Sequence, residues 1–227
     1  MFQPLIIGHR GAAAVAPENT LPSFEAAIQA GADGVEFDVR LSRDGVPMVI
    51  HDETLYRTAG VRRRVADLTS DQLNELDVPS LAQLFELFKS NEMLLCLEMK
   101  GEESQLVEAC CRLIDERRLK DRVILSCFEH SMLELVKSID STFTTAALFQ
   151  SPSAFIVERA IAIGASEIAL HHRLVNETLV QKARLADLKS VSWTVDDPAW
   201  VTSAHQIGVH ALITNNPSAL IAARNAI

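Results

Sequence analysis

Residues 29–39 read Gln-Ala-Gly-Ala-Asp-Gly-Val-Glu-Phe-Asp-Val, and they decide which fold we expect for this chain of 227 residues. A helical pattern ends at Gly31, and the mostly apolar run Gly34–Val39 follows at once. Glycine readily takes the left-handed conformation that closes a helix. The stretch therefore predicts a helix, a glycine cap and a buried strand in succession.

The same succession recurs along the chain. Residues 162–169 read Ala-Ile-Gly-Ala-Ser-Glu-Ile-Ala, and residues 206–213 read Gln-Ile-Gly-Val-His-Ala-Leu-Ile. Eight short runs of this apolar kind can be recognised: Leu5–Gly8, Gly34–Val39, Met93–Glu98, Arg122–Ser126, Phe143–Leu148, Glu167–Leu170, Ser190–Thr194 and Ala211–Thr214. Nearly continuous apolar runs are typical of parallel strands that are covered on both faces.

Helical patterns separate these runs, and Pro198–Ile207 reads as a helix with proline in its first turn. Eight such units predict an α/β protein with a (β/α)8 barrel, the TIM-barrel fold. An open doubly wound sheet is the alternative, but the sequence has no glycine-rich dinucleotide fingerprint that would favour it.

One segment interrupts the alternation. Pro47–Ile50 is a further strand-like run, and Ser42-Arg43-Asp44-Gly45 before it is typical of a hairpin turn. We expect this extra β-hairpin after the second strand to fold back over the barrel mouth and to place His51 opposite Asp38. Residues 56–79 then form a short excursion. Without a linker-like stretch, we expect one domain over residues 1–227.

Composition narrows the function. The formal net charge of −9 disfavours a nucleic-acid partner, which usually requires a basic surface. The cysteines Cys96, Cys110, Cys111 and Cys127 form no C-x-x-C pair, so we interpret them as buried thiols in a reducing compartment. Because the first residues have no basic start and only a short apolar run, and no later apolar stretch is long, we expect neither a secretory signal nor stable membrane insertion. We expect a cytoplasmic monomer or homodimer that acts on a small molecule.

Three carboxylates indicate a metal site. Glu36 and Asp38 are two residues apart on one strand and so share a face, and Glu98 ends the next strand. Inside a barrel, such carboxylates would repel one another and lose solvation unless a cation lay between them. An all-oxygen set favours Mg²⁺ or Ca²⁺. For either Glu36 or Asp38 alone, an ion pair with Arg10 or Lys100 would be the simpler interpretation.

His9 and His51 flank these carboxylates in the predicted barrel and are the candidate acid and base, since imidazole exchanges a proton near neutral pH. Hydrolysis of a phosphodiester requires both groups, one for the attacking oxygen and one for the leaving alcohol. The other histidines complete no such arrangement and are interpreted as structural: His130, His171, His172, His205 and His210.

Cationic side chains near these residues are candidates for binding phosphate. Arg10 suits bidentate contact and Lys100 offers a point charge, while Glu18 could orient Arg10. Arg57 and the run 62–64 could steer anions, although we favour a solvated surface for the run.

Two residues before the first helix need no functional role at this stage. Asn19 or Thr20 suits the N-cap, with Pro22 in the first turn. Helix initiation is sufficient to explain both.

These residues together resemble the glycerophosphodiester phosphodiesterase family of the bacterial cytosolic type. The matching motifs come in family order over nearly the whole chain: His9-Arg10-Gly11, Pro17-Glu18-Asn19-Thr20, Glu36-Phe37-Asp38-Val39, His51-Asp52, Thr54-Leu55, Arg57-Thr58, Leu97-Glu98-Met99-Lys100 and Trp193-Thr194-Val195. Each motif alone is weak, whereas the ordered set is specific.

The resemblance implies a TIM barrel that cleaves glycerophosphodiesters into glycerol 3-phosphate and an alcohol, with one Mg²⁺ or Ca²⁺. It implies acid/base roles for His9 and His51, metal ligation by the three carboxylates, and a glycerol-facing position for Trp193. The chain departs from the family pattern at two positions: Asp196 stands where many relatives have asparagine, and Asn215 where aspartate is common. The compact segment after His51 suggests an open mouth that tolerates varied alcohol groups.

Other functions rank lower. A phospholipase-type relative that acts on lyso- or intact phospholipids would need apolar surface for acyl chains, and the sequence shows no amphipathic insertion. A non-catalytic barrel would be favoured by loss of a histidine or carboxylate, and all are present. A metal-dependent lyase or aldolase is compatible with the fold alone.

Overall fold

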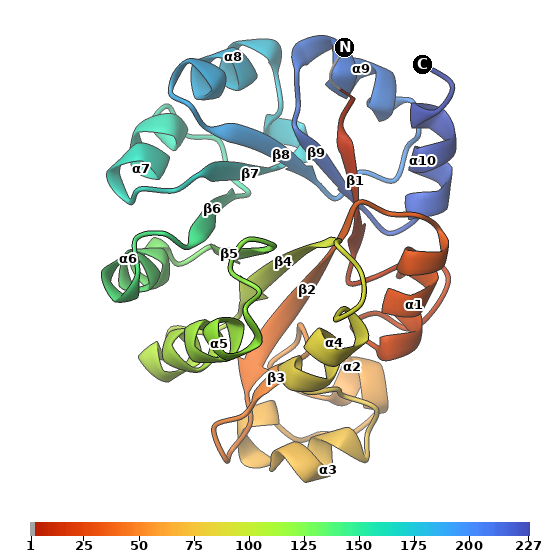
Figure 1. The fold of residues 1–227 in the computed structure, drawn as a ribbon, viewed down its shortest axis with the longest axis vertical. Helices are drawn as coiled ribbons and strands as arrows, with labels where there is room; N and C mark the ends of the chain where they lie inside the picture. The colour runs from red at the N-terminus through yellow and green to blue at the C-terminus, as the bar shows by residue number, and fades with distance from the viewer. Residues whose placement is uncertain (1–2) are drawn as a thin grey trace.

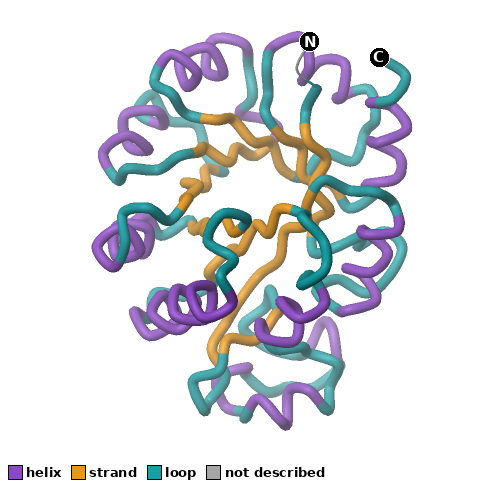
Figure 2. Tube along the Cα trace, in the orientation of Figure 1, coloured by secondary structure: helices purple, strands orange, loops and turns teal. Residues whose placement is uncertain are grey.

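The computed structural model describes residues 3–227, and the strands within that range close into a barrel with helices around it (Figures 1 and 2). The elements are β1 Leu5–His9, α1 Leu21–Gln29, β2 Gly34–Leu41, β3 Pro47–Val49, α2 Tyr56–Ala59, η1 Val65–Asp67, α3 Ser70–Asn74, α4 Leu81–Leu87, β4 Leu94–Met99, α5 Ser104–Arg117, β5 Val123–Cys127, α6 His130–Ile139, β6 Thr144–Phe149, α7 Ile156–Ala162, β7 Glu167–His171, η2 His172–Leu174, α8 Glu177–Leu185, β8 Lys189–Trp193, α9 Trp200–Ile207, β9 Ala211–Thr214 and α10 Pro217–Arg224.

Eight parallel strands of this described range form the ring in the order β1-β9-β8-β7-β6-β5-β4-β2, and β1 pairs with β2 to close it. All eight strands predicted from the sequence are present. The glycines that suggested them have positive φ as expected, for example +75° at Gly31 and +86° at Gly208. The prediction of a (β/α)8 TIM barrel is confirmed.

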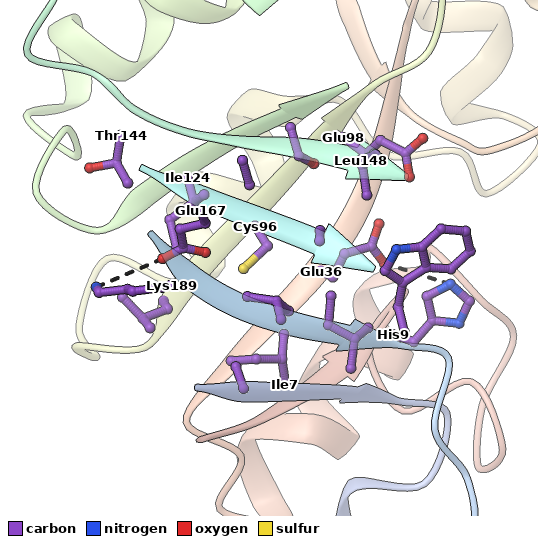
Figure 3. A pocket seen from close by; sticks show the side chains of 18 of the residues that line it. Ile7, His9, Glu36, Cys96, Glu98, Ile124, Thr144, Leu148, Glu167 and Lys189 are labelled. Carbon is purple, nitrogen blue, oxygen red and sulfur yellow. Dashed lines mark ion pairs between the residues drawn. The ribbon is translucent and has the colours of Figure 1, made fainter. Parts of the chain in front are cut away.

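The strands divide their side chains between two environments. On β2, Val35, Phe37 and Val39 point outward into the apolar layer beneath the helices, and Glu36 and Asp38 alternate with them. Small residues such as Ala169 and Ala211 line the inside. The ring therefore encloses a cavity of about 260 Å³, which reaches from the Glu167–Lys189 pair at the amino ends of the strands to His9 and Glu36 at the carboxyl ends (Figure 3).

The extra strand is present, but its position and register differ from the prediction. β3 pairs antiparallel with the far end of β2, outside the ring and beside its mouth rather than over it (Figure 1). Ile50, not His51, lies opposite Asp38, since the Ile50 N–H donates to the Asp38 carbonyl at 2.9 Å. The turn is the reason: Ser42 pairs with Val46 around a three-residue loop in which Gly45 has φ +76°.

The excursion after His51 forms a small satellite core beside the barrel. Its buried members come from the hairpin and from residues 55–78, including one each from η1 and α3: Met48, Ile50, Leu55, Val65, Leu68, Leu73 and Val78. This core holds β3 in place and thereby positions the segment that carries His51.

Two further observations concern the start of α9 and the search for membrane-crossing helices. Pro198 precedes α9, whose N-cap is Ala199, so the proline is not in the first turn as predicted. Among the helices of residues 3–227, none has both the length and the apolar character that crossing a bilayer demands.

Candidate active site

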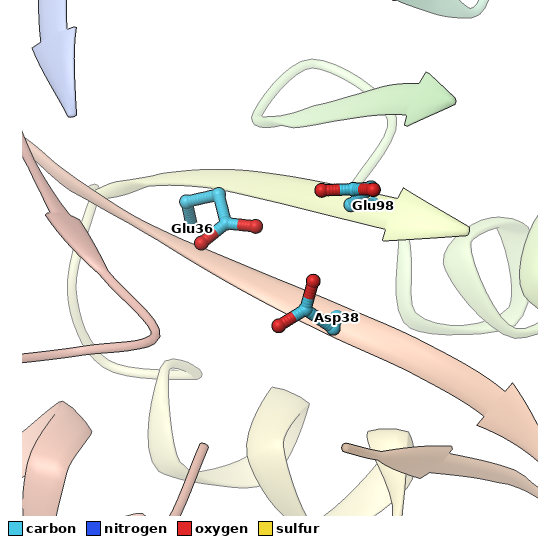
Figure 4. Close-up of side chains that lie close together, drawn as sticks. All are labelled: Glu36, Asp38 and Glu98. Carbon is cyan, nitrogen blue, oxygen red and sulfur yellow. The ribbon is translucent and has the colours of Figure 1, made fainter. Parts of the chain in front are cut away.

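The carboxyl ends of β1, β2 and β4 bring the predicted site residues together. Glu36, Asp38 and Glu98 are almost fully buried, and one oxygen of each lies within 4.8 Å of the others (Figure 4). The strand register explains the cluster, because β1 pairs His9 with Glu36 and β4 pairs Glu98 with Asp38.

Two cations contact this cluster, and both favour Asp38. Lys100 Nζ lies 3.2 Å from Asp38 Oδ1 and also pairs with Glu98, while Arg10 Nε lies 3.2 Å from Asp38 Oδ2. Burial alone would raise the pKa of Asp38, yet Lys100, Arg10 and His51 hold that pKa below its usual value. The ion pair considered from the sequence therefore exists, and it neutralises one of the three carboxylates.

The other two carboxyl groups ionise less readily than Asp38. Burial, with the nearby charges of Asp38 and Glu98, raises the pKa of Glu36 well above its usual value. Burial, with Asp38, raises the pKa of Glu98 to about 7. In addition, Asp38 Oδ1 and Glu98 Oε1 are buried but accept no hydrogen bond of good geometry, although Lys100 lies near both. The cluster offers three closely spaced carboxylates, the donor type that a hard divalent cation prefers.

His9 is the last residue of β1 and lies beside Glu36 in the strand register. Its Nδ1 lies 2.7 Å from Asn215 Oδ1, and its Nε2 lies 3.9 Å from Glu36 Oε2. Burial and the neighbouring Arg10 lower the pKa of this imidazole. A neutral His9 therefore predominates near pH 7, which suits exchange of a proton at Nε2.

His51 is the second residue after β3, and its side chain lines the same cavity. Its Nδ1 lies 2.7 Å from Asp52 Oδ1, so its Nε2 also remains available. Burial lowers the pKa of His51, while Asp38 and Asp52 oppose that shift. One cavity is thus lined by His9 and His51 together with Glu36 and Glu98 of the carboxylate cluster.

The predicted phosphate-binding residues lie around this cavity as well. Arg10, Lys100 and Trp193 line it. Arg10 Nη1 donates to Glu18 Oε1 at 2.6 Å, the contact expected from the sequence. Phe128 packs edge-to-face against the Trp193 ring, with 5.6 Å between the two ring centroids.

Two residues have roles that the sequence reading missed. Asn19 does more than begin a helix: Thr20 is the N-cap, and Asn19 is buried with φ +57°. Its Nδ2 donates to Asp38 Oδ2 at 2.8 Å, and its Oδ1 accepts from the Asp38 N–H at 3.3 Å. Its place beside Glu18 in the Pro-Glu-Asn-Thr motif was the available signal.

Arg57 is the second residue whose role was not predicted from the sequence. It is not free to steer anions, because it donates to both oxygens of Asp52 and both oxygens of Glu18 at 2.7–2.9 Å. Arg57 therefore links the segment of His51 to the segment of Arg10. Within the arginine run, Arg64 pairs with the exposed Glu53 at 2.7 Å, in keeping with a solvated surface.

Comparison with known proteins gives consistent results. Residues 9–219 match the model of the glycerophosphoryl diester phosphodiesterase family. The glycerophosphodiester phosphodiesterase of Caldanaerobacter subterraneus subsp. tengcongensis is 32% identical over 97% of each chain.

Solved structures agree with this. A phosphodiesterase of Oleispira antarctica, in complex with the product sn-glycerol-3-phosphate, superimposes with a TM-score of 0.90 at 25% identity, covering 98% of this chain and 97% of that one. A glycerophosphodiester phosphodiesterase of Thermotoga maritima gives a TM-score of 0.83 at 26% identity, covering 98% and 99%.

Proposed function

This chain belongs to the glycerophosphoryl diester phosphodiesterase family, and from that premise we propose that it hydrolyses glycerophosphodiesters to glycerol 3-phosphate and an alcohol. The observation that carries the proposal is one cavity lined by two histidines, two cationic side chains and two members of a carboxylate cluster, with the third member buried beside them. The product bound to the Oleispira relative supports the same substrate class.

Glu36, Asp38 and Glu98 would hold one Mg²⁺ or Ca²⁺. Their oxygen donors suit either hard cation, and a bound cation would offset the mutual repulsion that raises the pKa of Glu36 and Glu98. When bound, such an ion supplies positive charge to a phosphoryl oxygen and so favours attack on phosphorus.

His9 and His51 would divide the proton transfers between them. Both line the cavity, and in each the Nδ1 atom is engaged, by Asn215 or by Asp52, which leaves Nε2 for proton transfer. One imidazole would take the proton of the attacking oxygen, and the other would protonate the leaving alcohol.

Arg10, Lys100 and Trp193 would bind the rest of the substrate. Arg10 and Lys100 each have N–H groups beyond those directed at carboxylates, and these could contact phosphate oxygens. Trp193 would line the glycerol side, where its ring offers apolar contact. Glu18 would keep Arg10 oriented.

A substrate panel tests this proposal. With Mg²⁺ or Ca²⁺, purified protein is expected to release glycerol 3-phosphate from glycerophosphocholine and glycerophosphoethanolamine, which a coupled dehydrogenase assay reports. A lysophospholipid, the substrate of the alternative function, is expected to react far more slowly. Absence of glycerol 3-phosphate from every glycerophosphodiester with either metal would refute the proposal, and preference for the lysophospholipid would favour the alternative.

Metal affinity is expected to depend on pH because of Glu98. The metal-free carboxyl has a pKa of about 7, and only its deprotonated form binds a cation. Below pH 7 a proton must leave on binding, so this group alone should raise the Kd about fivefold from pH 7 to 6 and about tenfold per pH unit further below its pKa. Calorimetry in buffers of different ionisation enthalpy would count the released proton. A Kd that is constant over this range would contradict the expected competition.

A further inference from the structure

A chain of hydrogen bonds leads from His9 to the two positions at which the sequence departs from the family pattern. His9 Nδ1 lies 2.7 Å from Asn215 Oδ1, and Asn215 Nδ2 donates to Asp196 Oδ2 at 2.7 Å. The other oxygen of Asp196 accepts from the Asn215 N–H at 2.8 Å and from the Thr214 hydroxyl at 3.0 Å. The two departures therefore contact each other.

These contacts determine which group donates and which accepts in each hydrogen bond of the series from Asp196 to His9. An ionised carboxylate can only accept, so Asp196 requires the NH₂ group of Asn215 to face it. The amide oxygen of Asn215 must then face His9, and since that oxygen can only accept, Nδ1 of His9 must carry the proton. The neutral imidazole is left with its lone pair on Nε2, the nitrogen that faces Glu36 and the cavity.

We propose that Asp196 and Asn215 are positioning residues which together hold the neutral imidazole of His9 in the Nδ1–H tautomer. This inference rests on the proposed function for its catalytic consequence, but the tautomer itself can be measured without any activity. It also explains how the two departures can coexist: one carboxylate and one amide are retained, with their positions exchanged.

Asp196→Asn gives the sharpest test. The oxygen of residue 196 that accepts from Thr214 and the Asn215 N–H is expected to stay, which turns the new NH₂ group toward Asn215. The Asn215 amide must then reverse and point its own NH₂ at His9, which favours the Nε2–H tautomer. The double variant D196N/N215D is expected to restore Nδ1–H, because residue 215 can again only accept.

¹⁵N NMR of the histidine side chains at about pH 8, where a histidine is ordinarily neutral, reports the tautomer directly. We expect Nδ1–H for His9 in the wild type, loss of that state in D196N and its return in the double variant. The kcat for a glycerophosphodiester should fall roughly 10- to 100-fold in D196N, the range for outer partners of functional histidines, and recover in the double variant.

Asp197→Asn is the matched control. Asp197 is the neighbouring carboxylate, which accepts from the Ala199 N–H at 2.9 Å. The Asp197→Asn variant should have the same His9 tautomer and the same kcat as the wild type. A wild-type His9 that carries its proton on Nε2, or a D196N variant with an unchanged tautomer, would overturn the proposal. If the wild type proved inactive on every glycerophosphodiester, the proposed function would fail, whereas the tautomer assignment would still stand or fall by the NMR result.

Discussion

Glu36→Gln is expected to weaken binding of Mg²⁺ or Ca²⁺ by more than about 100-fold, beyond the range for loss of an outer-shell partner. The substitution keeps the volume of the side chain and an oxygen that can accept the Arg10 N–H, but it removes a ligand charge. Calorimetric titration measures the affinity. The metal-free variant should be no less stable than the metal-free wild type, since burial and two neighbouring carboxylates oppose the charge of Glu36.

Glu167→Gln is the matched control for this experiment. Glu167 is also a buried carboxyl inside the barrel, but it lies at the opposite end of the cavity, paired with Lys189 (Figure 3). Its substitution should leave metal affinity unchanged. If Glu36→Gln bound metal normally and only lowered the melting temperature, Glu36 would have a structural role in an ion-pair network instead.

His9→Ala and His51→Ala are each expected to lower kcat by about 10²-fold or more, the usual contribution of a positioned acid or base. Both variants should retain metal binding, because neither imidazole belongs to the carboxylate cluster. Steady-state kinetics with a glycerophosphodiester, together with calorimetry, separates the two effects.

His205→Ala, on the outer helix α9, serves as the control and should retain full activity. The result for His51 matters most, because a long path connects it to the site: the hairpin, the satellite core and the Arg57 contacts. A normal kcat in His51→Ala would show that His51 is not a catalytic acid or base.

Much of this arrangement can be predicted from the sequence because it follows from periodicity. A parallel strand alternates its side chains, so Glu36 and Asp38 share a face, and the barrel register then brings Glu98 beside them. Strand ends meet at one edge of a barrel, which is why His9 and the carboxylates could be assigned to one site before the structure was known.

What could not be predicted depends on geometry that periodicity does not encode. The register of the hairpin was displaced by one residue because the number of residues in its turn is set by the conformation of Gly45. The role of Asn19 is not encoded in the local sequence, because an asparagine side chain suits a helix cap as well as a buried partner of Asp38. Arg57 and Glu18 are 39 residues apart in the sequence, so their ion pair depends on the tertiary fold and not on a local pattern.

The two departures from the family pattern illustrate the same limit. Read separately, Asp196 and Asn215 cast doubt on the surroundings of the site. In the structure they bond to each other and to His9, so the exchange of carboxylate and amide leaves the contact with the imidazole intact.

The most direct test of the central claim is the metal dependence of product release. Wild-type protein treated with a chelator and freed of it by gel filtration is assayed on glycerophosphoethanolamine, before and after addition of Mg²⁺ or Ca²⁺. We expect no release of glycerol 3-phosphate from the stripped protein and full recovery with one of the two ions. Undiminished release by the stripped protein would contradict the account of a metal held by Glu36, Asp38 and Glu98.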